Sequence, residues 1–555
     1  MSDILCSHPI YTYISTLAGY DPVRTYYVCA PEEDAASLDS LARFAEASGW
    51  RETAQREGAV LVMPAAPGGW DALPDTLLMD IYLETRNRFQ TRSGKALWGR
   101  QGGLWCWETM ICLTGYRQGA AFAGRALVRC PSLFAAAALV EGAPVDFQAG
   151  DQPSSHWLVK NVGGDYRKRN RDIPVCLWMW GSREQTRPAV DYFTQQEGAG
   201  PVEVAIAGHP ARLWQSEDRP ACQVAVFSGG PRPGPELTQL IAGELFSHAI
   251  RWKNSPDGTL DWLPSREEFY RHPRFTRHTV TANGSDYDFF VHLPAGMDRE
   301  AAAGLPLVFT VHGRGEPAWM FTTKNGWDRL ADETGEFILV SPDSPGNIWF
   351  LDRDGAAFPA MVQFMAEHYR IDTTRVYLTG FSNGGMMARE TGVRYPWLFA
   401  GISPWNAPRA DTFALRREDS PAMPDRFGPE MEEVLAGFTA GGYELPAWFC
   451  YGDNDPAAAP EENLMLETLL RANGCTGEAV ALDSASQYPR GAGYQQGERF
   501  STVVYPRADG TVPVAVTVMK EMPHGAIHDQ SRAAWRFLRR FRRIEGRKDI
   551  CLDMG

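Results

Sequence analysis

The chain has 555 residues, 44% of them hydrophobic and 22% charged, which is typical of a globular protein with more than one domain. Its net charge of −14 argues against a nucleic-acid partner, because nucleic-acid-binding surfaces are rich in Lys and Arg. No apolar run reaches the roughly 18 residues that a membrane-spanning helix needs, so we expect no membrane partner.

Cysteine usage and the first residues predict the compartment. Residues 1–6 carry no basic segment, and polar residues follow before any apolar core of a signal peptide. No Cys/His spacing typical of a zinc site occurs. We therefore expect a cytoplasmic protein without a bound metal or other cofactor. Several cysteines lie in apolar, strand-like runs and are expected to be buried thiols: Cys29, Cys112, Cys176, Cys222 and Cys450.

The first half alternates apolar runs with helical stretches. Residues 26–31 and 59–64 have the composition of buried strands, and residues 37–55 between them have that of a helix. Strands that alternate with helices predict a parallel sheet flanked by helices. The first half is therefore assigned to the α/β class.

The same pattern returns in the second half at an offset of 277 to 278 residues. Residues 49–54 correspond to 326–331, and residues 60–64 correspond to 338–342. Turn-forming residues at 253–258 separate the halves. We predict tandem α/β domains over residues 1–260 and 261–555.

Residues 377–388 of the second half form a strand, a glycine-flanked turn and the start of a helix. The turn is G-x-S-x-G, with Ser382 between Gly380 and Gly384. Such a nucleophile elbow needs glycines because the turn is sharp, and it exposes the serine hydroxyl at the edge of the sheet. Ser382 is therefore the predicted nucleophile of an acyl transfer.

Two further residues complete a predicted Ser-His-Asp triad. Asp455 comes just after an apolar strand, and His524 follows another strand ahead of a helix over residues 531–543. Asp453 and His528 are the alternative acid and base. The order Ser382, Asp455, His524 is the one that the α/β-hydrolase fold imposes.

The first half contains a counterpart of the elbow without its serine. Residues 112–119 align with 377–384, and Arg117 stands at the position of Ser382. Arginine stays protonated and cannot accept an acyl group. We expect a non-catalytic first domain in which Arg117 pairs with Glu184, the counterpart of Asp455; a retained ligand pocket is the alternative.

The oxyanion of the transition state needs backbone N–H donors. Asn383 begins the helix after the elbow, so its N–H is one candidate. Arg314 lies in the glycine-rich loop after the strand over residues 305–311, and its N–H is the other. The preceding His312 is interpreted as a structural residue that holds this loop.

Two tryptophans and one long insertion are candidates for the substrate pocket. Trp405 follows the strand after the elbow and is a candidate pocket wall, with ordinary core packing as the alternative. Trp349 is a candidate contact for an aryl acyl group, again with packing as the alternative. The segment over residues 407–445 is long, charged and proline-containing, which favours a cap over the site.

Residues 277–543 resemble the α/β-hydrolase esterase family that includes poly(3-hydroxybutyrate) depolymerases and feruloyl and acetylxylan esterases. The matching segments are residues 293–297, 305–315, 380–385, 452–456 and 523–525, together with the helix that carries Trp535. Tyr451 departs from the histidine that the family often has there. Secreted members of the family carry signal peptides and disulfides. Neither is expected from this sequence, which argues against an extracellular polymer as the substrate.

The resemblance implies a serine esterase acting on a small or oligomeric ester of feruloyl or aryl, acetyl or hydroxyalkanoate type. A serine peptidase or amidase on the same fold is one alternative, and a pseudoenzyme that serves as a binding scaffold is another. The sequence leaves open whether the first half binds substrate, covers the site or forms a homodimer.

Overall fold

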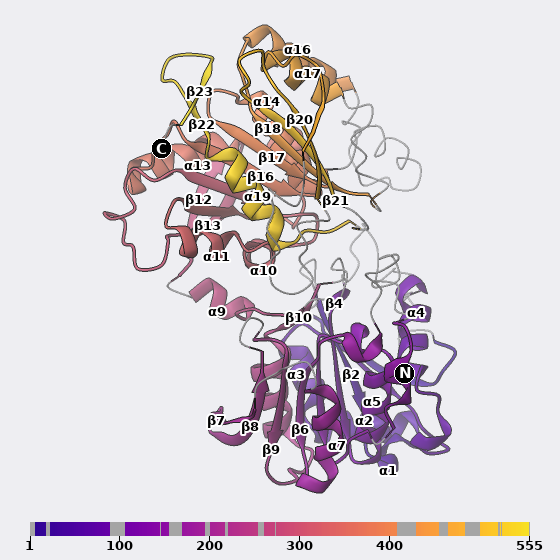
Figure 1. The fold of residues 1–555 in the computed structure, drawn as a ribbon. Helices are drawn as coiled ribbons and strands as arrows, with labels where there is room; N and C mark the ends of the chain where they lie inside the picture. Colours follow the sequence, from indigo (N-terminus) through magenta and orange to yellow (C-terminus); the bar gives the residue numbers. More distant parts are fainter. Residues whose placement is uncertain are drawn as a thin grey trace. The chain divides into compact units, whose positions relative to one another are not determined.

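The computed structural model divides into two compact units, Met1–Ser265 and Arg266–Gly555, each built on its own sheet (Figure 1). The residues that it describes are 6–17, 23–88, 106–144, 146–154, 169–194, 200–216, 220–252, 260–271, 274–407, 429–453, 455, 464–482, 500–519, 522 and 524–553.

The first unit has a nine-stranded sheet in the order β1-β3-β2-β4-β5-β6-β9-β8-β7. The six strands from β3 to β9 run parallel, while β1 at one edge and β8 and β7 at the other pair antiparallel. The strands are β1 (Ile10–Ile14), β2 (Val23–Cys29), β3 (Val60–Pro64), β4 (Cys106–Tyr116), β5 (Ala136–Val140), β6 (Cys176–Trp180), β7 (Val202–Ile206), β8 (His209–Gln215) and β9 (Gln223–Phe227).

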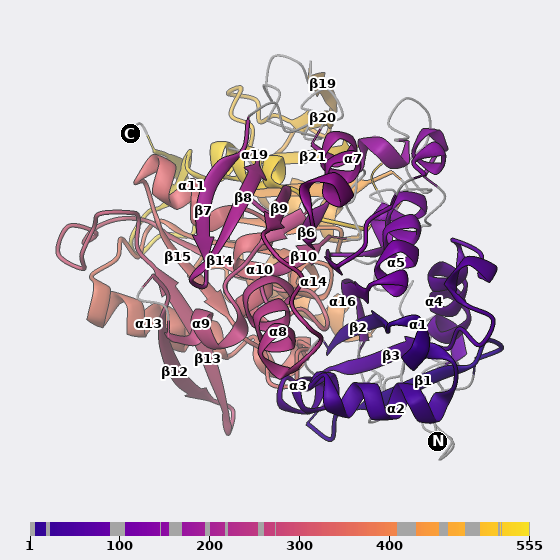
Figure 2. The same cartoon turned by 90° about the horizontal axis from the view of Figure 1, so that it is seen from below.

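Helices flank this sheet, as the view from below makes clear (Figure 2). They are α1 (Glu32–Ala35), α2 (Leu38–Ala47), α3 (Trp50–Arg56), α4 (Leu77–Arg88), α5 (Gln118–Arg129), α7 (Arg183–Phe193) and α8 (Pro235–Leu240), and a two-stranded sheet of β10 (Ala249–Arg251) and β11 (Leu260–Trp262) follows. The single helix predicted over residues 37–55 is wrong. Gly49, at φ 84°, divides it into α2 and α3, and a Cβ there would lie 2.9 Å from the Pro235 Cα.

The second unit has a ten-stranded sheet in the order β12-β13-β15-β14-β16-β17-β18-β21-β20-β19. The six strands from β15 to β21 are parallel, and antiparallel pairs lie at both edges. The strands are β12 (Thr276–Ala282), β13 (Ser285–His292), β14 (Leu307–Val311), β15 (Ile338–Pro342), β16 (Val376–Phe381), β17 (Gly401–Trp405), β18 (Ala447–Gly452), β19 (Val480–Leu482), β20 (Phe500–Tyr505) and β21 (Val514–Met519).

The helices of the second unit cover its sheet (Figure 1). They are α9 (Arg266–Arg271), α10 (Ala318–Lys324), α11 (Trp327–Thr334), α12 (Leu351–Asp354), α13 (Ala357–Tyr369), α14 (Asn383–Arg394), α16 (Pro429–Gly441), α17 (Leu464–Ala472) and α19 (His528–Leu538). The helix predicted over residues 531–543 is wrong at its end, because α19 stops at Leu538. A hairpin of β22 (Phe541–Arg543) and β23 (Ile550–Leu552) follows it.

The two units share one strand topology. Six parallel strands, β3-β2-β4-β5-β6-β9 in the first and β15-β14-β16-β17-β18-β21 in the second, follow the same chain order. In both, one antiparallel strand, β1 or β13, pairs with the first parallel strand, and an antiparallel hairpin precedes the last parallel strand in the chain. The second unit adds β12 at its first edge. The predicted tandem of α/β units is therefore confirmed.

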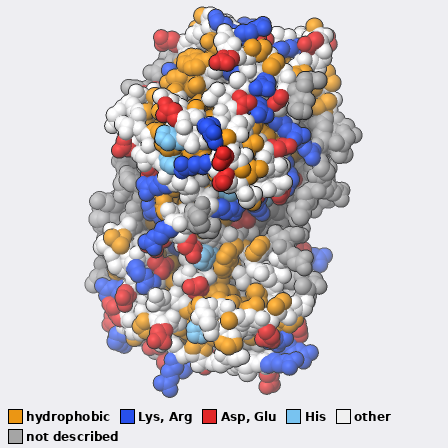
Figure 3. All heavy atoms as spheres, turned by 90° about the vertical axis from the view of Figure 1, so that its left-hand side faces the viewer, with side chains coloured by type: hydrophobic (Ala, Val, Ile, Leu, Met, Phe, Trp, Pro, Cys, Tyr) orange, Lys and Arg blue, Asp and Glu red, His pale blue; other side chains and the backbone are white. Residues whose placement is uncertain are grey.

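The five cysteines expected to be buried are buried free thiols. Burial raises the pKa of Cys112 and of Cys450 to about 12, so both stay protonated at neutral pH. Among the residues that the structure describes, no helix is long and apolar enough to cross a membrane. On the face seen in Figure 3, acidic and basic side chains are intermingled.

Candidate active site

Ser382 lies at the carboxyl end of β16, in the turn that leads directly into α14. Its backbone has φ 56° and ψ −118°, a region that residues with a Cβ rarely adopt. The Ser382 N–H donates to the Trp405 carbonyl of the adjacent strand β17 at 2.9 Å. This hydrogen bond fixes the turn, so the strain is held by the sheet itself.

The flanking glycines are required by close backbone contacts. A Cβ on Gly380 would lie 2.2 Å from the Gly384 carbonyl oxygen, and a Cβ on Gly384 would lie 2.1 Å from the Val311 carbonyl oxygen. Neither contact is possible for a larger residue. The glycines thus let the first turn of α14 pack against the end of β14, which carries the next loop of the site.

His524 links the Ser382 hydroxyl to the Asp455 carboxylate. Its Nε2 lies 2.8 Å from Ser382 Oγ, and its Nδ1 lies 2.6 Å from Asp455 Oδ2. Because a carboxylate only accepts hydrogen bonds, Nδ1 carries the proton and Nε2 is left to accept the hydroxyl proton. Asp455 is buried (4% exposed), whereas the His524 side chain is 38% exposed and open to a reactant.

The two alternative residues lie elsewhere. Asp453 accepts a hydrogen bond from the Met522 N–H at 3.2 Å and so holds the loop that precedes His524. His528 is the first residue of α19, and its ring accepts from the Arg329 guanidinium, with Nη2 at 2.9 Å from Nδ1. Both residues therefore support the loop and helix around the triad geometry without entering it.

Asn406 was not anticipated from the sequence. Its side-chain N–H donates to Asp455 Oδ2 at 2.9 Å, and its backbone, at φ 44°, donates to the Cys450 carbonyl of β18 at 2.8 Å. Asn tolerates positive φ better than most residues. The sequence feature that could have predicted this role is an Asn directly after the strand that neighbours the elbow. Its role here is to orient the carboxylate that faces His524.

The loop after β14 is held against the elbow by three buried side chains. His312 Nδ1 donates to the Gly313 carbonyl at 2.7 Å, and its Nε2 accepts from the Ser344 N–H at 3.1 Å. Trp349 Nε1 donates to the His312 carbonyl at 3.0 Å. The Asn383 side-chain oxygen accepts from the Trp349 N–H at 2.7 Å. The interpretation of His312 as a loop-holding residue is confirmed, and burial lowers its pKa to about 4.

The backbone N–H groups of Asn383 and Arg314 remain the predicted oxyanion donors. Asn383 is the first residue of α14, where an N–H has no partner inside its own helix. Arg314 lies in the loop whose His312 carbonyl is in contact range of Gly384. The structure thus brings the two segments together, while the oxyanion role stays a prediction.

A buried ion pair lies under the same loop. Lys324, the last residue of α10, pairs with Glu316, and their side chains are 2% and 5% exposed. The Lys324 ammonium also lies 4.8 Å from the ring centre of Phe381, whose ring centre is 4.9 Å from that of His524. The pair therefore connects the loop after β14 to the residue that precedes Ser382.

Trp405 and Trp349 are both interior residues, 0% and 1% exposed. Trp405 Nε1 donates to Ser403 Oγ at 2.7 Å, and its ring stacks on that of Trp327. Their contribution to a substrate pocket stays a prediction. Both tryptophans stabilise the site's backbone: the Trp405 carbonyl accepts a hydrogen bond from the Ser382 N–H, and Trp349 Nε1 donates to the loop after β14.

Most of the predicted cap, residues 408–428, lies outside the described residues. The part that is described forms α16, in which Leu435 and Phe438 are buried in the core of the unit. This portion is thus a core helix that packs near α14.

Arg117 occupies the first unit's elbow but does not pair with Glu184, so that prediction is wrong. Its guanidinium pairs with Glu33 at 2.8 Å and with Glu141 at 3.4 Å. Glu184 is an exposed residue in the first turn of α7, because this helix begins immediately after β6 where the second unit has the Asp455 loop. Glu141 holds the place after β5 that Asn406 holds after β17.

Among the residues that the structure describes, no three His, Cys, Asp or Glu side chains gather as a metal site would require. A hydroxyl, an imidazole and a buried carboxylate in one hydrogen-bonded chain are the groups that nucleophilic acyl transfer uses.

Comparison with known proteins finds relatives among ester hydrolases. No protein-family model matches the chain. A poly(3-hydroxyalkanoate) depolymerase C from Paucimonas lemoignei is 24% identical over 274 residues, which are 45% of this chain and 61% of the relative. A probable acetylxylan esterase A from Aspergillus fumigatus is 29% identical over 206 residues, 34% of this chain and 47% of the relative.

A third relative, feruloyl esterase B from Thermothelomyces thermophilus, is 26% identical over 129 residues, 21% of this chain and 43% of the relative. In all three cases the matched region covers less than two thirds of the relative's own length. The chain is thus similar in sequence to a polyhydroxyalkanoate depolymerase and to feruloyl and acetylxylan esterases, which are carboxylic ester hydrolases.

Proposed function

We propose that the protein is a serine hydrolase that cleaves carboxylic esters at the second unit. The observation that carries the proposal is the hydrogen-bonded chain Ser382–His524–Asp455 at a strained strand-to-helix turn. Relatives named for feruloyl, acetylxylan and polyhydroxyalkanoate esters support ester substrates of these types.

The reaction proceeds in two acyl transfers. His524 Nε2 takes the hydroxyl proton as Ser382 Oγ attacks the ester carbonyl, and Asp455 stabilises the imidazolium that forms. The N–H groups of Asn383 and Arg314 receive the oxyanion. His524 then returns the proton to the departing alcohol, which leaves an acyl-enzyme. Water attacks this ester with His524 again as the base, and the carboxylic acid is released.

The first unit performs no acyl transfer in this proposal. Arg117 replaces the nucleophile and is engaged by two carboxylates, Glu33 and Glu141. A guanidinium remains protonated at neutral pH and cannot attack a carbonyl. Each chain therefore carries one reactive serine.

Labelling with a fluorophosphonate probe tests the proposal. We expect the full chain to be labelled once, the label to be lost in Ser382→Ala, and the label to persist in Arg117→Ala, the matched change at the other elbow. Turnover of acetyl, cinnamoyl and 3-hydroxybutyryl esters, beside the corresponding amides, then identifies the acyl group. A folded chain that is not labelled, or that is labelled equally in Ser382→Ala, would overturn the proposal.

A further inference from the structure

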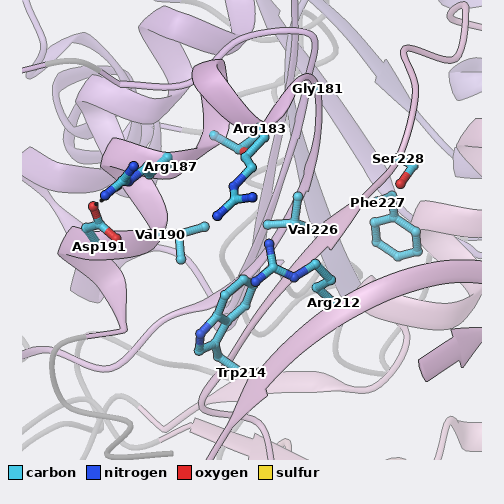
Figure 4. A pocket seen from close by; sticks show the side chains of 11 residues that line it. Gly181, Arg183, Arg187, Val190, Asp191, Arg212, Trp214, Val226, Phe227 and Ser228 are labelled. Carbon is cyan, nitrogen blue, oxygen red and sulfur yellow. Dashed lines mark ion pairs between the residues drawn. The ribbon is translucent and has the colours of Figure 1, made fainter. Parts of the chain in front are cut away.

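The first unit has a pocket of about 420 Å³ at the carboxyl ends of β6 and β9 (Figure 4). Its walls come from the first turns of α7, from strand β8 and from the residues that end β9. In open α/β sheets this edge is where ligands bind. The pocket thus occupies a position that the fold favours for binding, in the unit whose elbow has lost its nucleophile.

One wall of the pocket forms where β6 leads through Gly181 and Ser182 into α7. Ser182 caps α7, its hydroxyl accepting from the Gln185 N–H at 3.3 Å, and Arg183 is the first helical residue. In the second unit, Gly452 is followed instead by the loop that carries Asp455. The first unit therefore presents the positive end of a helix dipole where the second unit presents a carboxylate.

Three guanidinium groups and a single carboxylate line the pocket, in a protein whose net charge is −14. Arg187 pairs with the lining Asp191 at 3.6 Å, and Arg212 pairs with Glu203, an 80% exposed side chain outside the lining, at 3.5 Å. Arg183 makes no ion pair with any described residue. Figure 4 shows the Arg183 and Arg212 side chains directed toward the same part of the pocket. Two converging cations favour a bound anion.

The rest of the lining is apolar. Trp214 lies under Arg212, whose guanidinium carbon is 5.0 Å from the indole ring centre, and Val190 and Val226 lie beside it. Phe227 is held rigidly by stacking on Trp180 at 4.4 Å between ring centres. A ligand that is complementary to both the arginine side chains and the apolar lining has an anionic head and an apolar body.

We propose that this pocket binds a small organic carboxylate. The carboxylate lies between Arg183 and Arg212, because the planar guanidinium fork matches carboxylate geometry. The apolar body lies over Val190, Val226 and Trp214. The site is non-catalytic and does not depend on the function proposed for the second unit.

Calorimetric titration of the full chain with trans-cinnamate tests the proposal, with cinnamyl alcohol as the neutral analogue and inorganic phosphate as an anion without an apolar body. We expect cinnamate to bind, and the alcohol and phosphate to bind at least about tenfold more weakly, since each lacks one of the two contacts. Arg183→Gln and Arg212→Gln should each weaken cinnamate binding about tenfold or more. Arg56→Gln, the same change at an exposed ion pair on α3 outside the pocket, should leave binding unaltered.

Four results would each overturn the proposal. They are absence of binding at about 10 mM cinnamate, equal binding of the alcohol, equal binding of phosphate, and unaltered binding in the Arg183→Gln/Arg212→Gln double variant. The last would place the cinnamate at another site, such as the one around Ser382. If Arg212→Gln perturbs the fold because Arg212 covers Trp214, the exposed Arg183→Gln decides alone.

Discussion

Arg117 and Ser382 share one unusual backbone conformation. Arg117 has φ 52° and ψ −118°, and Ser382 has φ 56° and ψ −118°. Each N–H donates to the last residue of the neighbouring parallel strand, Val140 at 2.8 Å and Trp405 at 2.9 Å. The strained turn is thus retained in a unit that has no serine there, which shows that the sheet and the flanking glycines impose it, independently of the side chain that it presents.

The strain at Ser382 predicts that two inactive variants differ in stability. Ser382→Ala keeps the Cβ in the unfavourable region, while Ser382→Gly removes it and should be more stable than the alanine variant by about 1–2 kcal/mol. Both variants should lose at least about a thousandfold in turnover if the serine is the nucleophile. Urea unfolding and ester hydrolysis measure the two effects. Equal stability of the two variants would show that the turn is unstrained.

Because Asp455 is hydrogen-bonded to His524, we expect substitution of Asp455 to lower kcat far more than substitution of the nearby Asp453. Asp455→Asn removes the negative charge that stabilises the imidazolium and can turn an amide N–H toward Nδ1, which favours the wrong tautomer of His524, so kcat should fall by about 10⁴ with little change in KM. Asp453→Asn is the matched control, since the Asp453 side chain bonds only the Met522 N–H among the contacts described, and the effect of this change on kcat should stay within about tenfold. A larger loss in Asp453→Asn would reverse the assignment.

The buried pair of Lys324 and Glu316 predicts strong coupling. Lys324→Met leaves the Glu316 carboxylate buried without its cation and should destabilise the second unit by about 3–5 kcal/mol. The double variant Lys324→Met/Glu316→Gln should recover part of this loss, because no unpaired charge remains. Denaturant unfolding gives the coupling energy.

Arg532→Met serves as the control for this pair, because Arg532 and Glu333 form an ion pair with both side chains about half exposed. Its effect should remain below about 1 kcal/mol. Additive effects of the Lys324 and Glu316 changes would contradict the coupling.

His312 predicts that the second unit loses stability in acid. Burial lowers its pKa from 6.5 to about 4, so between these values the unfolded chain binds a proton that the folded chain does not. The stability that neutral His312 contributes is complete above about pH 6.5 and is lost as the pH falls toward 4, at most about 3 kcal/mol.

Denaturant unfolding between pH 4 and 7 measures this slope. His312→Gln should reduce it, whereas His368→Gln, at an exposed position on α13, should leave it unaltered; the part that remains includes His528, whose pKa burial lowers to about 3. An unaltered slope in a folded His312→Gln variant would show that other groups govern the acid response.

Local sequence determined the elements that depend on backbone geometry and short-range pattern. Gly380 and Gly384 around Ser382 indicate the elbow because only glycine fits those close contacts, and buried apolar runs such as residues 338–342 indicate strands because every side chain there is interior. The repeat at residues 49–64 and 326–342 indicated the tandem organisation, since related sequences fold alike. The order of the serine, aspartate and histidine candidates followed from the same strand pattern.

Tertiary structure alone decided which groups meet. Two pairings depend on how strands and loops pack: Asn406 with Asp455, and Lys324 with Glu316. The hydrophobic periodicity of the sequence does not predict either of them. The division of residues 37–55 at Gly49 depends on contact with Pro235, far away in the chain. Arg117 pairs with Glu33 and Glu141 and not with Glu184, because α7 begins at Arg183, two residues after Gly181, and Glu184 is exposed in its first turn. The strained turn at Ser382 follows from its neighbours in the sequence, whereas the side chains that pair with one another are determined by how the strands, helices and loops pack.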